Sequence, residues 1–80
     1  MRKEVQKQLQ ELCSEYCGCK IELEDELIET KRLSSIRLFE LLCELEEMYS
    51  IEFSRDEITC VNNFSTVNNM VDIVVRKRME

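Results

Sequence analysis

Two adjacent serines, Ser34 and Ser35, are the residues of this chain whose type and position best suit chemistry. They stand directly before an amphipathic run, residues 36–49, that has the spacing of a helix. A helix start leaves backbone N–H groups without partners and carries the positive end of the helix dipole, so it attracts anions. A phosphate ester on one of these hydroxyls would therefore be electrostatically favoured.

The same serine pair also has an ordinary structural interpretation, because serine is a preferred residue at the N-cap of a helix. The side-chain oxygen of an N-cap serine accepts a hydrogen bond from a backbone N–H of the first turn. Taken by themselves, the two serines predict a cap at Ser34 or Ser35 rather than a modification site. The surrounding residues have to decide between the two interpretations.

The helix predicted over 36–49 carries apolar residues on two faces. At about 100° per residue, one face forms a core stripe. The core stripe comprises Leu38, Leu41, Leu42, Leu45, Met48 and Tyr49. The opposite face sets apolar residues among carboxylates, and we interpret it as a docking face for a basic partner. The docking face comprises Ile36, Phe39, Glu40, Cys43, Glu44 and Glu47. Because single exposed apolar residues are common, an ordinary solvent-facing surface is the alternative.

Five cysteines offer a second kind of chemistry, metal binding or redox reactions. Cys13, Cys17 and Cys19 lie close together in the sequence, but their C-x3-C-x-C spacing matches neither a standard zinc ribbon nor a C-x-x-C redox motif. The chain has no histidine to complete a site. We expect no metal. An odd number of cysteines argues against a closed disulfide framework and favours a reducing, cytoplasmic location.

Clustered acids such as residues 24–26 and 46–47 do not predict catalysis or calcium binding. Adjacent helical residues point to different faces, and the spacing of an EF-hand is absent. One glycine and no histidine leave little for a glycine-rich phosphate loop or for histidine acid–base catalysis. We therefore expect no enzyme activity.

The excess of acidic residues limits the classes of partner that the chain is expected to bind. A net charge of −6, from 17 acidic and 11 basic residues, disfavours nucleic acid, since duplex binding depends on Lys and Arg neutralising phosphates. No stretch approaches the roughly 20 apolar residues that cross a membrane, and the basic start has no apolar segment behind it, unlike a signal peptide. We expect a cytoplasmic monomer with protein partners and no membrane contact.

The elements that position these residues are predicted to be the helices of one all-α domain, residues 1–80, because the chain lacks proline and is rich in helix-compatible residues. A first helix is expected over 3–16, ended by Gly18, then a long loop over 19–33 with a helical turn at 24–28. A short helix is expected over 56–61, followed by a last helix capped by Ser65. The apolar positions expected in the core of the first and last helices are Val5, Leu9, Leu12, Cys13, Tyr16, Val67, Met70, Val71 and Val74.

Three segments also carry a family resemblance: LIETKRLSSIRLFELL at 27–42, LEEMYSIEF at 45–53 and EITCVNNFSTV at 57–67. Together they resemble the acyl carrier protein superfamily, which includes peptidyl carrier domains and D-alanine carrier proteins. The pattern of that superfamily is Asp-Ser-Leu/Ile before a helix that ends in Leu-Glu-x-x-Phe, then an Ile-x-Ile/Phe turn and a last helix that starts with Phe-x-Thr-Val. The resemblance runs from about residue 9 to residue 75.

The resemblance implies an acyl-carrier-like bundle of three long helices and one short one, with a long loop between the first two. It implies that Ser35 carries a covalent 4′-phosphopantetheine arm, and that acyl or aminoacyl cargo is held on the arm as a thioester. The partners it implies are a phosphopantetheinyl transferase, an acyl- or aminoacyl-loading ligase and downstream acyl-handling enzymes, which meet the docking face. Residues 36–41 look closer to stand-alone aminoacyl-type carriers than to fatty-acid carriers.

The chain departs from the family pattern immediately before Ser35. Ser34 stands where the family has aspartate, Lys31 where it has glycine and Arg32 where it has an aliphatic residue. In the family, that aspartate takes part in recognition by the transferase. A dedicated transferase, inefficient modification and a carrier that has lost its arm all fit this departure. The alternative function is therefore a degenerate, unmodified carrier-like protein that acts as a protein-interaction module.

Overall fold

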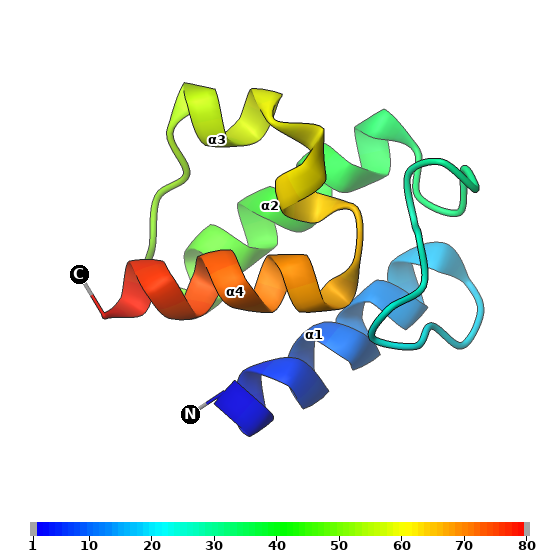
Figure 1. Cartoon of the computed structure of the whole chain (residues 1–80), viewed down its shortest axis with the longest axis horizontal. Helices are drawn as coiled ribbons and strands as arrows, with labels where there is room; N and C mark the ends of the chain where they lie inside the picture. The colour runs from blue at the N-terminus through cyan, green and yellow to red at the C-terminus, as the bar shows by residue number, and fades with distance from the viewer. Residues whose placement is uncertain (1, 80) are drawn as a thin grey trace.

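The computed structural model of the chain describes residues 2–79, apart from the side chain of Val61. This part of the chain forms helices and no strand, which confirms the predicted all-α class. The α-helices are α1 (Arg2–Cys17), α2 (Ser35–Tyr49), α3 (Arg55–Thr59) and α4 (Val67–Arg78), and a 3-10 helix, η1 (Val61–Phe64), follows α3. Figure 1 shows α4 alongside α1, with α2 crossing behind α4 and the short α3 at the edge away from α1.

The core lies between α1, α2 and α4. In α1, Val5, Leu9 and Cys13 are buried as predicted, whereas Leu12 and Tyr16 are only half-buried. All four apolar positions predicted for the core side of α4 are buried, and Ile73 joins them. The core is closed by Ile21, Leu27, Leu33 and Phe53 from the connecting segments and by Phe64 from η1. The rings of the last two meet edge to face, with their centroids 5.5 Å apart.

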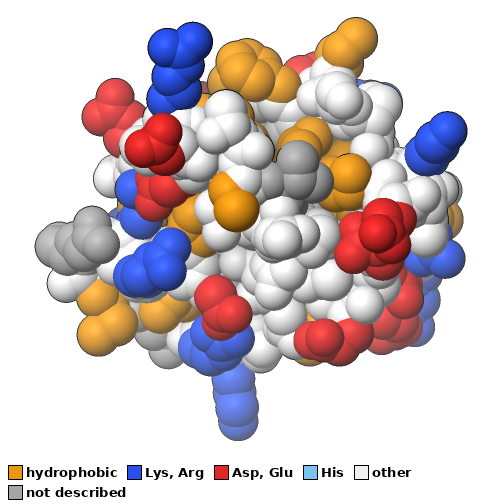
Figure 2. Space-filling view, turned by 45° about the horizontal axis from the view of Figure 1, so that its top comes forward, with side chains coloured by type: hydrophobic (Ala, Val, Ile, Leu, Met, Phe, Trp, Pro, Cys, Tyr) orange, Lys and Arg blue, Asp and Glu red, His pale blue; other side chains and the backbone are white. Residues whose placement is uncertain are grey.

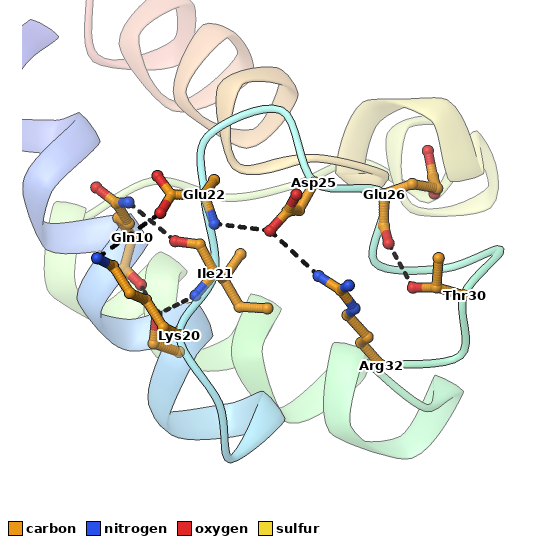
Figure 3. A network of polar contacts seen from close by, with 9 residues as sticks. Gln10, Lys20, Ile21, Glu22, Asp25, Glu26, Thr30 and Arg32 are labelled. Carbon is orange, nitrogen blue, oxygen red and sulfur yellow. Dashed lines mark hydrogen bonds and ion pairs between the residues drawn. The ribbon is translucent and has the colours of Figure 1, made fainter.

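The loop between α1 and α2 is as long as predicted, but the helical turn expected at 24–28 is wrong. The backbone instead forms isolated turns, in which the Asp25 N–H donates to the carbonyl of Glu22 and the Lys31 N–H to that of Ile28, and other backbone groups bond to distant residues. The N–H of Leu27 donates to the carbonyl of Ser65 at 2.8 Å, and the carbonyl of Leu23 accepts from the N–H of Asn68 at 3.1 Å. Within the loop, the Asp25 carboxylate accepts from the Glu22 N–H and pairs with Arg32 (Figure 3). Because the Leu27 N–H is bonded to Ser65, it is not available for a helical turn at 24–28.

The residues at the helix ends fix where α1 ends and where α4 begins. Gly18 ends α1 as predicted, with a positive φ of 71° and its N–H bonded to the carbonyl of Ser14. The prediction that Ser65 caps α4 is wrong. Thr66 is the N-cap and accepts from the Asn69 N–H at 3.1 Å, while Ser65 is buried and donates to the carbonyl of Asn62. Thr66 is one residue nearer the helix, so its side chain reaches the first turn.

The short third helix begins one residue earlier and ends sooner than predicted. Ser54 and Glu57 form a reciprocal capping box: the Glu57 N–H donates to the Ser54 hydroxyl and the Ser54 N–H to the Glu57 carboxylate. This box fixes the start of α3 at Arg55, and residues 61–64 form the separate helix η1. Of the helices described in residues 2–79, none is long and apolar enough to cross a membrane.

Candidate functional site

The two serines at the start of α2 have different tasks. Ser34 is the N-cap, with extended backbone angles, and its hydroxyl oxygen accepts a hydrogen bond from the Arg37 N–H at 3.2 Å. Ser35 is the first residue inside the helix and is exposed. Within residues 2–79, the Ser35 hydroxyl makes no hydrogen bond. The structure therefore assigns the cap, which the sequence left open between the two serines, to Ser34 alone.

An apolar groove opens beside the exposed Ser35 hydroxyl. It lies between the first half of α2 and the short helix α3, and its volume is about 300 Å³. The lining residues are Ser35, Leu38, Phe39, Leu42, Ile58 and Thr59. This groove gives a long, partly apolar group attached to Ser35 a surface to lie on.

Four of the groove residues were not predicted as part of a site: Leu38 and Leu42, which were assigned to the core stripe, and Ile58 and Thr59. For the last two, the sequence predicted only that they belong to a short helix, residues 56–61. Ile58 is half-buried and packs against the core, so it has the pattern of an ordinary core residue. The signal that identifies its second role is spatial, since only the packing of α3 against α2 brings it to the side of Ser35.

The predicted docking face is exposed along most of α2. Ile36 is 75% exposed and Phe39 is 59% exposed, although both are large apolar residues. Glu40, Cys43 and Glu47 are exposed as well. Figure 2 looks at the molecule from the side of α3 and shows hydrophobic side chains reaching the surface between acidic and basic ones. Such a mixture of apolar and charged groups is typical of surfaces that bind partners transiently.

One docking-face residue and one core-stripe residue lie elsewhere than predicted. Glu44 is half-buried, and its Oε2 atom is a buried oxygen without a hydrogen-bond partner among the described residues. Met48, predicted in the core stripe, is 46% exposed, so that prediction is wrong. Leu41, Leu42, Leu45 and Tyr49 fill the core from α2, and Leu38 is half-buried. At 100° per residue Met48 lies at the edge of the core stripe, outside Leu41, while the neighbouring Tyr49 points inward and is buried.

Three basic residues, Lys31, Arg32 and Arg37, lie close to Ser35 in the sequence, and Arg32 is paired with Asp25. Lys31 and Arg37 are exposed, and the Arg32 side chain is 42% exposed. The Arg37 guanidinium lies over the ring of Tyr16, 5.7 Å from its centroid, which is within cation–π distance. Burial, and then the nearby carboxylate of Glu44, raise the pKa of the Tyr16 hydroxyl above its ordinary value. Tyr16 is therefore a neutral platform for Arg37 at physiological pH.

The cysteines divide between the core and the surface. Cys13 is buried, and its thiol lies 3.7 Å from the sulfur of Met70. Burial, with a smaller effect of Cys17, raises the pKa of Cys13 to about 12, so this thiol is inert near neutral pH. Cys19, Cys43 and Cys60 are exposed. In the described part of the chain, no three Cys, Asp or Glu side chains are grouped as metal ligands would be.

Comparisons with known proteins do not identify the site. No family model matches the chain, and no curated protein or solved structure matches it either. The function of this chain is therefore inferred from the residues and the geometry around Ser35.

Proposed function

We propose that this protein is a carrier that holds acyl or aminoacyl cargo as a thioester on a 4′-phosphopantetheine arm attached to Ser35. The protein makes and breaks no bonds itself. It presents the arm at the start of α2 and offers the docking face to a phosphopantetheinyl transferase, to a loading ligase and to downstream acyl-handling enzymes. The acyl-carrier-like arrangement of its helices is part of this proposal.

The observation that carries the proposal is the division of tasks between the two serines. Because the Ser34 hydroxyl caps α2, the Ser35 hydroxyl is free to react without loss of the cap. A phosphodiester on Ser35 would lie at the first helical position, where the backbone N–H groups and the helix dipole favour negative charge. The ester would therefore lower the stability of the fold only slightly.

The groove beside Ser35 supports the same proposal. Leu38, Phe39 and Ile58 supply apolar surface next to the hydroxyl, and Phe39 belongs both to the groove and to the docking face. An arm that rests in the groove can leave it when an enzyme docks, because the groove is shallow and its walls are side chains of two separate helices. A carrier needs such reversible contact, since cargo has to pass between enzymes.

The experiment is labelling of the purified protein with a fluorescent coenzyme A analogue and a broad-specificity phosphopantetheinyl transferase. The intact protein and a Ser34→Ala variant are expected to take up label, and Ser35→Ala is expected to take up none. A variant with Lys31→Gly and Ser34→Asp restores two of the residues expected for the family and is expected to react fastest. If this variant stays unlabelled while a known carrier is labelled in the same tube, the proposal is refuted.

The second candidate function is that of an unmodified protein-interaction module. Lys31, Arg32 and Ser34 favour it, because they replace residues that the carrier family uses for recognition. Under this alternative the docking face binds a partner protein and Ser35 stays a free hydroxyl. The absence of label on every variant, with partner binding that persists in Ser35→Ala, is the result that would support it.

A further inference from the structure

Residues 54–63, which include α3, are joined to the rest of the molecule at two neighbouring points. Phe53 directly before the segment and Phe64 directly after it are both buried. Their rings meet edge to face, with the centroids 5.5 Å apart, so the two ends of the segment are held side by side in the core. A surface segment of this length with closely spaced ends has the form of an Ω-loop. We call residues 54–63 the lid.

Between its two ends the lid buries little. None of its described side chains is buried, and Ile58 is the apolar residue among them that packs against the core. The helix in the lid, α3, has five residues, and an isolated helix shorter than about 12 residues is marginal in water. Figure 1 shows α3 at the edge of the molecule, away from α1. Because few buried apolar contacts hold the lid, it is expected to open at a lower free energy than the core unfolds.

One ion pair fastens the middle of the lid to α4. The Lys77 Nζ lies 2.7 Å from the Glu57 Oε1, and the two side chains are only 15% and 22% exposed. The other ion pairs of the described residues are more exposed to solvent. Among the hydrogen bonds and ion pairs that residues 54–61 make within the described chain, this ion pair alone reaches beyond the lid. Since solvent screens a sheltered pair weakly, it holds the lid more firmly than a surface pair would.

The Glu57 residue that makes this ion pair also orders the lid from within. Its carboxylate accepts the Ser54 N–H in the capping box that begins α3. Its backbone carbonyl accepts a hydrogen bond from the Asn63 side chain at 3.1 Å. The lid is therefore organised around Glu57, and a pull on this residue moves α3 as a unit.

The position of the lid decides whether the groove beside Ser35 has two walls. The α3 wall consists of Ile58 and Thr59, the two residues that follow Glu57. We propose that the lid is hinged at its two ends and held closed by the ion pair between Glu57 and Lys77, and that breaking this pair opens the groove while the helical core stays folded. The inference concerns a movement of the unmodified chain, so it holds whether or not the serine carries an arm.

The test is hydrogen exchange of single backbone amides in the full chain, followed by NMR with and without a low concentration of urea. The Ile58 and Cys60 amides report on the lid, since they bond to carbonyls within it at 3.0 and 3.2 Å. The amides of Leu45 in α2 and Val71 in α4 report on the core. The variant is Lys77→Gln, and Lys77→Arg keeps the charge.

The control variant is Arg2→Gln, which removes one cation from a different ion pair of α4. Arg2 pairs with Asp72 at 2.6 Å, more than one helical turn before Lys77. This pair stays intact when the lid opens and breaks only when α1 and α4 separate. A further variant, Glu57→Gln, removes the other charge of the lid pair and keeps an oxygen that can accept the Ser54 N–H. Together with the double variant it completes a double-mutant cycle.

In the parent protein we expect the lid amides to exchange faster than the core amides and to respond little to urea, because opening the lid exposes little surface. Lys77→Gln and Glu57→Gln should each accelerate the lid amides about tenfold, and the double variant no further. Lys77→Arg and the control should leave them within about twofold of the parent.

Three results would overturn the inference. The first is lid amides that match the core amides in both rate and urea dependence, because the lid would then open only when the whole fold unfolds. The second is lid amides that exchange in the parent as in an unfolded chain, because the lid would then not be held closed. The third is an acceleration in Lys77→Gln that is no larger than that in the control.

Discussion

Replacing Lys31 by glycine should stabilise the fold, although it removes a side chain. The left-handed backbone at φ 59° costs an L-residue about 1 to 2 kcal/mol. Against this relief of strain, glycine has greater conformational freedom in the unfolded chain, which lowers the free energy of unfolding by about 0.5 to 1 kcal/mol. The difference predicts a gain of about 0.5 to 1 kcal/mol in the free energy of unfolding, or about 2 to 8 °C in Tm for a domain of this size.

Two variants separate the backbone effect from the effect of the charge. Ser50 also has a positive φ, 53°, and caps the end of α2, so Ser50→Gly should raise Tm by a similar amount without any change of charge. Lys31→Gln keeps the Cβ atom and loses the charge, so it should leave Tm almost unchanged. Thermal and urea unfolding followed by circular dichroism measure all three variants. A loss of stability in Lys31→Gly, or an equal gain in Lys31→Gln, would refute the reasoning.

Three further predictions concern the cap, the pH dependence and the thiols. Ser34→Ala should cost about 1 kcal/mol in urea unfolding, since it removes the acceptor for the Arg37 N–H, while Ser35→Ala should cost much less. Although burial alone would raise the pKa of Glu57, its bond to Lys77 at 2.7 Å and those to Ser54 lower it below the ordinary 4.5. This carboxylate therefore stabilises the fold above about pH 4.5 and loses its contribution as the pH falls below that, so Glu57→Gln should flatten the acid limb of a Tm profile. Iodoacetamide at pH 8, followed by mass spectrometry, should alkylate the exposed cysteines first and Cys13 only after denaturant is added; rapid labelling of native Cys13 would contradict its burial.

Periodicity predicted the long helices well because each of them buries one side. The positions expected in the core of α4 are all buried, and α1 extends one residue beyond the predicted bounds at either end. Met48 was misplaced because it lies at the edge of the apolar stripe of α2, and helical spacing does not say how wide the buried part of a stripe is; the adjacent Tyr49 is buried. In the loop, Leu27 and Leu23 bond through their backbones to α4 and the residues before it, and no local pattern announces such tertiary hydrogen bonds.

The site was predicted unevenly for a similar reason. The sequence placed the serine pair at a helix start, because capping is a local property that serine and the apolar run reveal. Which serine caps α2 depends on backbone geometry, and the structure was needed to assign the cap to Ser34. The groove depends on α3 packing beside α2, so Ile58 and Thr59 were invisible as site residues. The backbone strain at Lys31 was likewise hidden, since lysine is unusual at a positive φ.

The most direct test of the central claim is to locate the modification on the protein itself. The chain is co-expressed with a broad-specificity phosphopantetheinyl transferase, and the purified product is analysed by intact mass and by fragmentation of the peptide that contains residues 33–37. The account predicts a fraction of the protein with the mass of one phosphopantetheine group, attached to Ser35 and absent from Ser35→Ala. An unmodified mass for both the parent and the Lys31→Gly, Ser34→Asp variant, with full modification of a known carrier in parallel, would contradict it.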